Sequence, residues 1–244
     1  MPAPPVTHLL FDFFGTLVDH APGGPGQGFA RTYGVTRGLG ATLTYREFLA
    51  AWARTTAHFG RLSAVDDREY PMTDLGTAFL REVLGRAPAR AETGLLVRSY
   101  LAEWNAGVRH LPGIGALLTG LAAQYRLAVV SNTQDAELLP GHLEAMGVRQ
   151  LFDTVVTSFE VGWRKPHPAV YRAALRELRV DPGSAVFVGD TYRADHEGPT
   201  RVGIRAFLID PQRRAPVPEE ARLASVFALP ARLAALGLAP PAPF

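Results

Sequence analysis

The sequence predicts an α/β fold, a doubly wound parallel sheet with an all-helical second domain inserted into it. Two observations carry this prediction. From residue 113 onward, short apolar runs alternate with helical patterns, which is typical of the βα units of a parallel sheet. Between the first and second apolar runs lies a long segment with helical periodicity and no obvious strand. That segment is the predicted insertion.

Five short apolar runs, each bordered by turn residues, have the length and composition of buried strands. They are residues 9–14, 127–131, 155–158, 185–189 and 206–209. Parallel sheets bind ligands beyond the carboxyl ends of their strands. We therefore expect a site near Asp12, Ser131, Lys165 and Asp190, each of which lies at or after such an end.

Two amphipathic segments in the second half of the chain predict helices that cover the sheet. Residues 113–125 and 169–178 place their apolar side chains at helical spacing, and Pro168 favours a helix start before the second segment. The apolar positions are Ile114, Leu117, Leu118 and Leu121 in the first segment, and Val170, Ala174, Leu175 and Leu178 in the second.

The insertion begins its helical pattern at Thr44-Tyr45-Arg46-Glu47, a capping box, and continues over residues 75–84 and 95–104. We predict a helical domain over residues 21–107 and an α/β domain over residues 1–20 and 108–244. The Gly/Pro-rich residues 21–26 and the segment 107–112 are the expected linkers, and two linkers would permit hinge closure.

Three aromatic residues of the insertion, Trp52, Phe59 and Trp104, lie at helical spacing. Contact with a substrate is one interpretation of these side chains. We favour the other, in which they form the core of the helical domain, because large apolar side chains on amphipathic helices are usually buried.

Composition places the chain among globular proteins and restricts its partners. It has 244 residues, 47% of them hydrophobic and 20% charged, and no cysteine, which excludes disulfides and thiolate metal sites. No export signal or membrane-spanning run is recognisable, so we expect a cytoplasmic location and no membrane partner. The net charge of +2 comes from scattered arginines without a basic run, so we expect no nucleic-acid partner, and a small anionic substrate stays open. The oligomeric state is not predicted.

Lys165 is the single lysine in a chain whose lysines and arginines number 25 together. A lysine ammonium is a compact charge that fits among several carboxylates, whereas arginine requires planar, bidentate geometry. Lys165 also lies in an expected strand-to-helix loop, where α/β folds place their chemistry. The composition alone is explained equally well by chance, in which one lysine happens to remain, and by a functional need for a compact positive charge.

Four short motifs follow one another at the expected strand ends. They are Asp12-Phe13-Phe14-Gly15-Thr16, Ser131-Asn132, Lys165-Pro166, and Gly189-Asp190 with Asp195. In this order and spacing they resemble the motifs of the haloacid dehalogenase-like (HAD) hydrolase superfamily, in the subgroup whose helical cap is inserted just after the first motif. The resemblance covers the whole chain and implies a Rossmann-like core with a cap.

The resemblance also implies roles for individual residues. Asp12 would be the nucleophile that forms a covalent aspartyl intermediate. Ser131 would hydrogen-bond the transferring group, and Lys165 would balance the negative charge of the nucleophile and of that group. Implied substrate-binding residues are Gly15, Thr16, Ser131, Asn132 and Lys165.

A magnesium site is implied as well. Its ligands would be Asp12, Asp190 and the backbone carbonyl of Phe14, with Asp195 supporting the ion or the lysine. The charges agree with this, because three carboxylates and Lys165 sum to −2, and one divalent cation would bring the sum to zero and let a phosphate approach. Oxygen ligands suit Mg²⁺. Asp19 is an alternative acidic residue that fits a helix cap or linker equally well.

Phe14 departs from the pattern of the family's phosphatases, which have a second aspartate there as general acid and base. Loss of such a group typically costs about a hundred- to ten-thousandfold in rate. Candidate substitutes are His20, His58 and His167, although a lone histidine is more often structural. We predict a Mg²⁺-dependent phosphatase of a small phosphorylated metabolite that favours leaving groups of low basicity.

Two alternatives stay open. An aromatic residue at position 14 resembles the family's 2-haloacid dehalogenases, whose halide leaving group needs neither proton nor metal. Their fourth motif is built around serine and asparagine, whereas Asp190 and Asp195 keep the acidic, metal-binding form. In the second alternative, Phe14 marks a non-catalytic module that binds a phosphometabolite or a protein on an enzyme scaffold.

Overall fold

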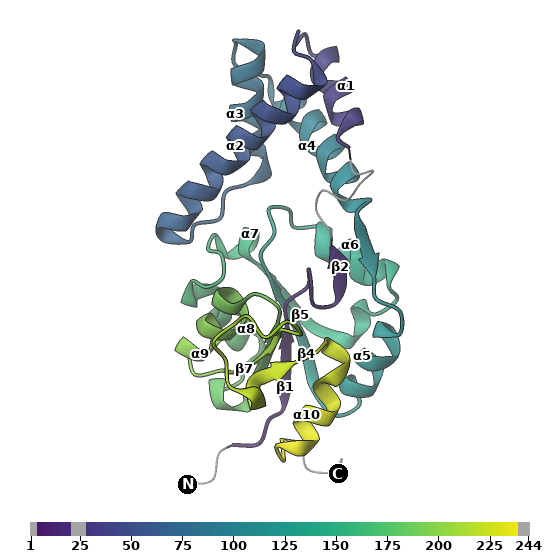
Figure 1. Ribbon diagram of the computed structural model, residues 1–244, viewed down its shortest axis with the longest axis vertical. Coiled ribbons are helices and arrows are strands. Elements are labelled where there is room, and N and C mark those ends of the chain that lie inside the picture. Colours follow the sequence, from purple (N-terminus) through teal and green to yellow (C-terminus); the bar gives the residue numbers. More distant parts are fainter. Residues whose placement is uncertain (1–3, 21–27, 239–244) are drawn as a thin grey trace. The chain divides into compact units, whose positions relative to one another are not determined.

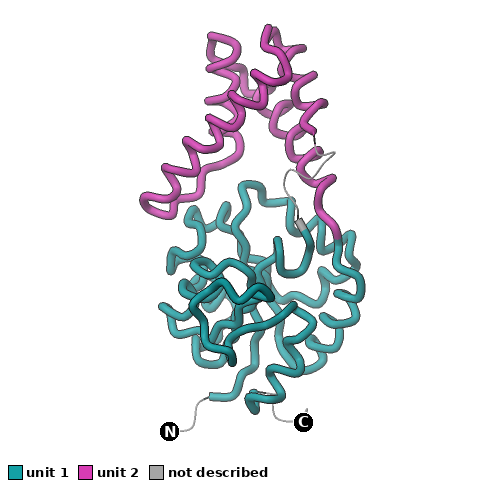
Figure 2. Tube along the Cα trace, in the orientation of Figure 1, with its two compact units in different colours: residues 1–19, 110–244 teal, residues 20–109 magenta. Residues whose placement is uncertain are grey.

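The computed structural model describes residues 4–20 and 28–238, so the expected linker at residues 21–26 lies outside the described residues. The chain divides into two compact units (Figure 2). One unit comprises Met1–Asp19 and His110–Phe244, and the other comprises His20–Arg109.

The first unit is built on a six-stranded parallel sheet in the order β5-β4-β1-β6-β7-β8. Its strands are β1 (His8–Phe11), β4 (Arg126–Ser131), β5 (Phe152–Thr157), β6 (Ala185–Gly189), β7 (Arg205–Ile209) and β8 (Arg222–Leu223). All five predicted strands are present, and the predicted fold class, a doubly wound parallel sheet, is confirmed.

The strand register aligns the strand ends that carry the motifs. Phe11, the last residue of β1, is paired with Val129 of β4 on one side and with Val188 of β6 on the other. The Asp12 N–H then donates to the Val188 carbonyl at 2.9 Å, which fixes the residue just beyond the strand. The chain order reverses at β1, since β4 and β5 lie on one side and β6, β7 and β8 on the other. Such a switch point is where open α/β sheets bind ligands.

Helices cover both faces of the sheet (Figure 1). Helix α8 (Pro168–Leu178) packs its predicted apolar face on one side, against Leu10, Val130 and Phe187 of the central strands. Helices α5 (Ile114–Ala122), α6 (Leu138–Ala145) and α10 (Leu229–Ala235) lie on the other side. Alternate residues of each central strand are therefore buried on opposite faces, which explains why these strands are apolar along most of their length.

The second unit is helical. Its helices are α1 (Ala30–Gly38), α2 (Tyr45–Asp66), α3 (Met72–Leu84) and α4 (Arg90–Asn105). The predicted capping box is confirmed, since the Thr44 hydroxyl accepts from the Glu47 N–H while the Glu47 carboxylate accepts from the Thr44 N–H. Trp52 lies in the buried cluster of this unit, where its ring meets Phe79 edge to face at 5.0 Å. Phe59 packs against the same cluster, and Trp104 is half-buried.

The remaining elements are short. They are β2 (Val18–His20) and β3 (Val108–His110), which form a two-stranded sheet, α7 (Ser158–Val161), α9 (Gly198–Arg201), the π-helix η3 (Tyr192–Glu197), and the 3₁₀ turns η1 (Arg149–Leu151), η2 (Pro182–Ser184), η4 (Glu219–Ala221) and η5 (Val226–Ala228). β2 and β3 are not among the predicted strands, because segments of three residues are too short to show a hydrophobic period. In the described parts of the chain, no helix has the length and apolarity needed to cross a membrane.

The start of β1 generates a prediction about pH. Burial lowers the pKa of His8, the positive charge of Arg126 acts in the same direction, and Asp153 opposes them. The unfolded chain therefore binds a proton below a pH of about 6.5 that the folded protein binds less readily, so acid destabilises the fold. We expect the free energy of unfolding, measured in urea, to fall between pH 7.5 and 5.5 less steeply in His8→Leu than in the unsubstituted protein. Equal slopes would contradict this account.

Candidate active site

The first motif forms a compact turn after β1. The Phe13 carbonyl accepts hydrogen bonds from the N–H groups of Thr16, Leu17 and Val18, at 2.9 to 3.3 Å. Gly15 lies in this turn at φ +83°, a conformation that favours glycine. The turn directs the Thr16 hydroxyl back to Oδ2 of Asp12 at 3.3 Å. Thr16, a predicted substrate-binding residue, therefore contacts the predicted nucleophile.

Two glycines allow the carboxylates of the site to approach the backbone. A Cβ atom on Gly15 would lie 2.2 Å from Oδ2 of Asp190, and one on Gly189 would lie 2.3 Å from Cγ of Asp195. Both distances are far below van der Waals contact. A side chain at either position would collide with an aspartate of the fourth motif. Gly15 thus leaves room for Asp190, and Gly189 leaves room for Asp195.

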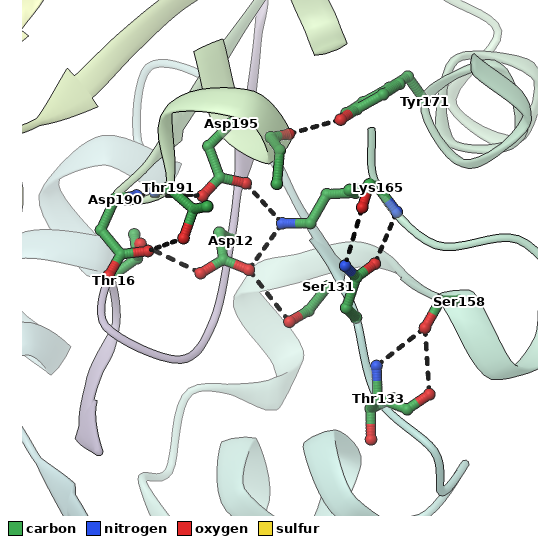
Figure 3. Close-up of polar contacts among 12 residues, drawn as sticks. Asp12, Thr16, Ser131, Thr133, Ser158, Lys165, Tyr171, Asp190, Thr191 and Asp195 are labelled. Carbon is green, nitrogen blue, oxygen red and sulfur yellow. Dashed lines mark hydrogen bonds and ion pairs between the residues drawn. The ribbon is translucent and has the colours of Figure 1, made fainter. Parts of the chain in front are cut away.

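Lys165 lies at the centre of the site (Figure 3). Its ammonium donates to Oδ1 of Asp12 and to Oδ1 of Asp195, both at 2.7 Å. All three residues are buried, with 5%, 6% and 1% of their surface exposed. The ammonium also lies over the Phe187 ring, 5.2 Å from its centroid. The single lysine of the chain is therefore a buried cation between two carboxylates.

These contacts shift the pKa values of the cluster. Burial opposes the charge of Lys165, but Asp12 and Asp195 outweigh it and raise the pKa of the ammonium. Burial raises the pKa of Asp195 to about 7, even though Lys165 acts in the opposite direction. Asp190 is exposed, yet the protein atoms packed around its carboxyl and the charge of Asp12 raise its pKa too. The cluster carries more negative charge than Lys165 balances.

The second motif positions Asp12 and Lys165. Ser131 is only 1% exposed, and its hydroxyl donates to Oδ1 of Asp12 at 3.1 Å. The Asn132 side chain accepts from the Lys165 N–H at 2.7 Å and donates to the Lys165 carbonyl at 3.1 Å. Asn132 therefore clamps the backbone of the lysine, and its role as a substrate ligand stays a prediction.

Several residues outside the predicted set support the cluster (Figure 3). Oδ2 of Asp195 accepts from the N–H groups of Asp190 and Thr191, at 3.1 and 2.9 Å. The Thr191 hydroxyl donates to Oδ1 of Asp190 at 3.2 Å, and the Tyr171 hydroxyl donates to the Ala194 carbonyl in η3. Thr133 and Ser158 are joined by two hydrogen bonds, which tie the ends of β4 and β5 together. Only Thr191, next to Asp190 in sequence, could have been inferred from the motifs.

The acidic residues fit a divalent cation. Asp12, Asp190 and Asp195 each offer a carboxylate oxygen, and these oxygens lie within 4.8 Å of one another. Both oxygens of Asp195 are already bonded, to Lys165 and to two backbone N–H groups, which suits an indirect role. Asp12 keeps Oδ2 on the side of Thr16, and Asp190 is exposed. Hard oxygen donors with excess negative charge are what Mg²⁺ requires.

The three histidines predicted as substitutes for the missing general acid, His20, His58 and His167, differ in their surroundings. His167 caps helix α8, accepting from the Ala169 N–H at 3.2 Å, and stacks on Trp163, so its role is structural. His58 is exposed on α2 of the helical unit, and the side chain of His20 lies outside the described structure. Asp19 is exposed in β2.

The imidazole beside Phe14 belongs instead to His142, on α6. The two rings meet edge to face with centroids 6.5 Å apart, and Phe13 lies 5.8 Å from the same imidazole. Nδ1 of His142 is 3.5 Å from Nε2 of His110. Sequence spacing gave no signal for this neighbour, because it lies far from Phe14 along the chain.

Comparison with known proteins identifies the family of this chain. The profile of the haloacid dehalogenase-like hydrolases matches residues 77–209, more than half of the chain. The chain belongs to this family. The predicted resemblance is thus confirmed.

The relatives within the family have different names, and they match different shares of this chain. Human haloacid dehalogenase-like hydrolase domain-containing protein 3 is 42% identical over 41% of this chain and 42% of its own. Human N-acylneuraminate-9-phosphatase is 30% identical over 66% of this chain and 68% of its own. The first two curated relatives are matched over less than half of their length. A 2-haloacid dehalogenase from Pseudomonas syringae shares the fold, with a TM-score of 0.68 and 23% identity over 95% of this chain and 99% of its own.

The buried ion pairs generate a prediction about stability. Lys165→Met leaves Asp12 and Asp195 buried without a cation, and removal of one partner from a buried pair typically costs about 3–5 kcal/mol. We expect a loss of this size in urea unfolding. Addition of Asp195→Asn should recover part of it, because one uncompensated charge is removed.

Arg201→Met provides the matched control for a salt bridge in solvent. Its pair with Glu197 spans i, i+4, and the arginine side chain is 59% exposed, so its loss should cost less than about 1 kcal/mol. Equal costs for Lys165→Met and Arg201→Met would refute the view that Lys165 holds the cluster together.

Proposed function

We propose that the protein is a Mg²⁺-dependent phosphatase of a small phosphorylated metabolite, working through an aspartyl-phosphate intermediate on Asp12. The observation that carries this proposal is the acidic cluster of Asp12, Asp190 and Asp195 around Lys165. A metal-free site with this charge would repel an anionic substrate, whereas a site with one divalent cation would accept a phosphate. The similarity to a curated phosphatase supports the same reaction class.

In the first step, a carboxylate oxygen of Asp12 attacks the phosphorus atom as the bond from phosphorus to the ester oxygen breaks. Lys165 and Ser131 both bond Oδ1 of Asp12, so the carboxylate is held in one orientation before the substrate arrives. The third N–H of the Lys165 ammonium would donate to an oxygen of the transferring phosphoryl group, and the Ser131 hydroxyl would turn from Asp12 to donate to that group. Asn132 keeps the lysine in place through its backbone.

In the second step, water attacks the phosphorus atom of the aspartyl phosphate, which releases phosphate and restores the Asp12 carboxylate. Asp12, Asp190 and the Phe14 carbonyl would hold the magnesium ion, which supplies positive charge for the phosphoryl oxygens in both steps. Asp195, bonded to Lys165 and to the backbone that precedes η3, would fix the relative positions of lysine and metal site.

Phe14 governs which leaving groups are accepted. A phenyl ring cannot donate a proton to the departing oxygen, so that proton must come from solvent or the leaving group must depart without one. Phe14 is also the observation that favours the dehalogenase alternative, in which halide departs unprotonated. Asp190 and Asp195 argue against it, since they retain the acidic form of the fourth motif.

The first experiment measures hydrolysis of p-nitrophenyl phosphate with and without Mg²⁺. We expect turnover that requires the metal and is abolished in Asp12→Asn, because the amide is not a nucleophile, and in Asp190→Asn, because a metal ligand is lost. Chloride release from 2-chloropropionate in the absence of metal would overturn the phosphatase proposal. Phosphate binding without turnover of either compound would favour the non-catalytic module.

The second experiment tests the role of Phe14. Phe14→Asp places a carboxylic acid at the position of the missing proton donor, so it should raise kcat for alkyl phosphates by up to about a hundredfold and change kcat for p-nitrophenyl phosphate far less. Phe14→Asn is the matched control, with nearly the same shape and no acidic proton. Similar rates for the Asp and Asn variants would show that proton donation is not what the site lacks.

A further inference from the structure

A cleft of about 670 Å³ adjoins the candidate active site. It is lined by Gly15, Asp190 and Tyr192, by the end of β7 at Leu208 and Ile209, and by residues 210–212 and 214–216 of the segment that follows. All of these residues belong to the α/β unit. The volume lies within the range of small-molecule sites, roughly 300–1,000 Å³. We call this feature the Arg214 cleft.

The segment after β7 is held in a defined conformation. Buried Asp210 accepts hydrogen bonds from the N–H groups of Arg214 and Ala215, at 3.0 and 2.9 Å. The Arg222 guanidinium pairs with Asp210 and donates to the carbonyls of Ala215 and Val217, each at 3.0 Å. This wall of the cleft is therefore preorganised, which lowers the entropic cost of binding a ligand against it.

Arg214 is the one cationic residue among the described residues that line the cleft. Hydrogen bonds from the Ala215 and Arg214 backbone, together with Arg222, lower the pKa of Asp210, so this carboxylate is ionised and its charge is balanced. Arg213 pairs with Glu219 at 2.8 Å and is not among the lining residues. Arg214 lines the cleft, and within residues 4–20 and 28–238 no carboxylate forms an ion pair with it.

The neighbouring residues add hydrogen-bond donors and apolar surface. Gln212 and Tyr192 line the cleft with Arg214 and offer an amide and a phenol hydroxyl. Pro211 and Pro216 contribute apolar surface on the same segment. A guanidinium with neutral donors beside it recognises a carboxylate or phosphate and the hydroxyl groups near it.

We propose that the Arg214 cleft binds the part of the substrate beyond the transferred phosphate and selects phosphorylated metabolites with a second negatively charged group, such as a phosphorylated sugar acid. This inference rests on the proposed phosphatase function and deepens it. With the phosphate at Asp12 and Asp190, the rest of the molecule extends along the cleft and places its second anionic group at Arg214.

The test compares two substrates that differ at one carbon. 6-Phosphogluconate and sorbitol 6-phosphate share their chain and phosphate, but one ends in a carboxylate and the other in an alcohol. We expect kcat/KM to be higher for the acid by on the order of tenfold or more, chiefly through a lower KM, because only the acid can accept a charge-assisted hydrogen bond from Arg214 with its carboxylate. Arg214→Ala should bring the ratio of the two kcat/KM values close to one, and Arg214→Lys should retain part of the preference.

Arg213→Ala is the matched control, because it removes a neighbouring arginine that does not line the cleft. It should leave the ratio unchanged. The proposal is overturned if the unsubstituted protein shows no preference for the acid, or if Arg214→Ala and Arg213→Ala change the ratio equally.

Failure of the subsite and failure of the phosphatase proposal are distinguishable. If the protein hydrolyses p-nitrophenyl phosphate but the ratio of kcat/KM for 6-phosphogluconate to that for sorbitol 6-phosphate is unchanged by Arg214→Ala, the subsite alone is overturned. Absence of all phosphate hydrolysis overturns the phosphatase proposal. The Kd values of the two sugar phosphates, measured by calorimetry with the Asp12→Asn protein and its Arg214→Ala derivative, then decide whether the cleft selects the acid.

Discussion

The ion pairs of Lys165 with Asp12 and Asp195 are the interactions on which the rest of the site depends. Carboxylates this close repel one another, and burial makes each charge costlier, so a cation must lie among them. Lysine is suited to that position because its ammonium donates to both carboxylates as a point charge. The Asn132 clamp and the glycines at positions 15 and 189 serve this arrangement, the first by fixing the lysine backbone and the others by leaving space for Asp190 and Asp195.

The parallel sheet is what brings these groups together. Four segments that are far apart in sequence end at one edge of the sheet, on either side of β1, where the strand order reverses. Solved structures named as dehalogenases share this fold, as does one named as a phosphatase, so the fold does not choose between the two reactions. The choice lies in a few side chains, with Phe14 suited to a leaving group that needs no proton and the aspartates of the fourth motif suited to a metal and a phosphate.

The Arg214 cleft is formed entirely by the α/β unit and adjoins Gly15 and Asp190, so the proposed recognition of the substrate there uses no residue of the helical unit. Its wall depends on the buried pair of Asp210 and Arg222, residues that no motif singled out. The segment after the fifth predicted strand, which contains no recognisable motif, therefore carries Arg214, the cation proposed to recognise the substrate.

The sequence by itself determined the sheet, the helical insertion and the strand ends where Asp12, Ser131 and Asp190 lie. It could do so because apolar periodicity and turn residues are local signals, and because the residue just past a parallel strand lies at a common edge. Lys165 lies in the predicted loop before α8, but the short helix α7 separates it from the end of β5. The tertiary structure alone decided what each side chain contacts. Asn132 bonds the Lys165 backbone, His142 lies beside Phe14, and Asp210 with Arg222 shapes the cleft. Such contacts join residues that are distant along the chain, and their distances and burial depend on how the whole sheet and its helices pack.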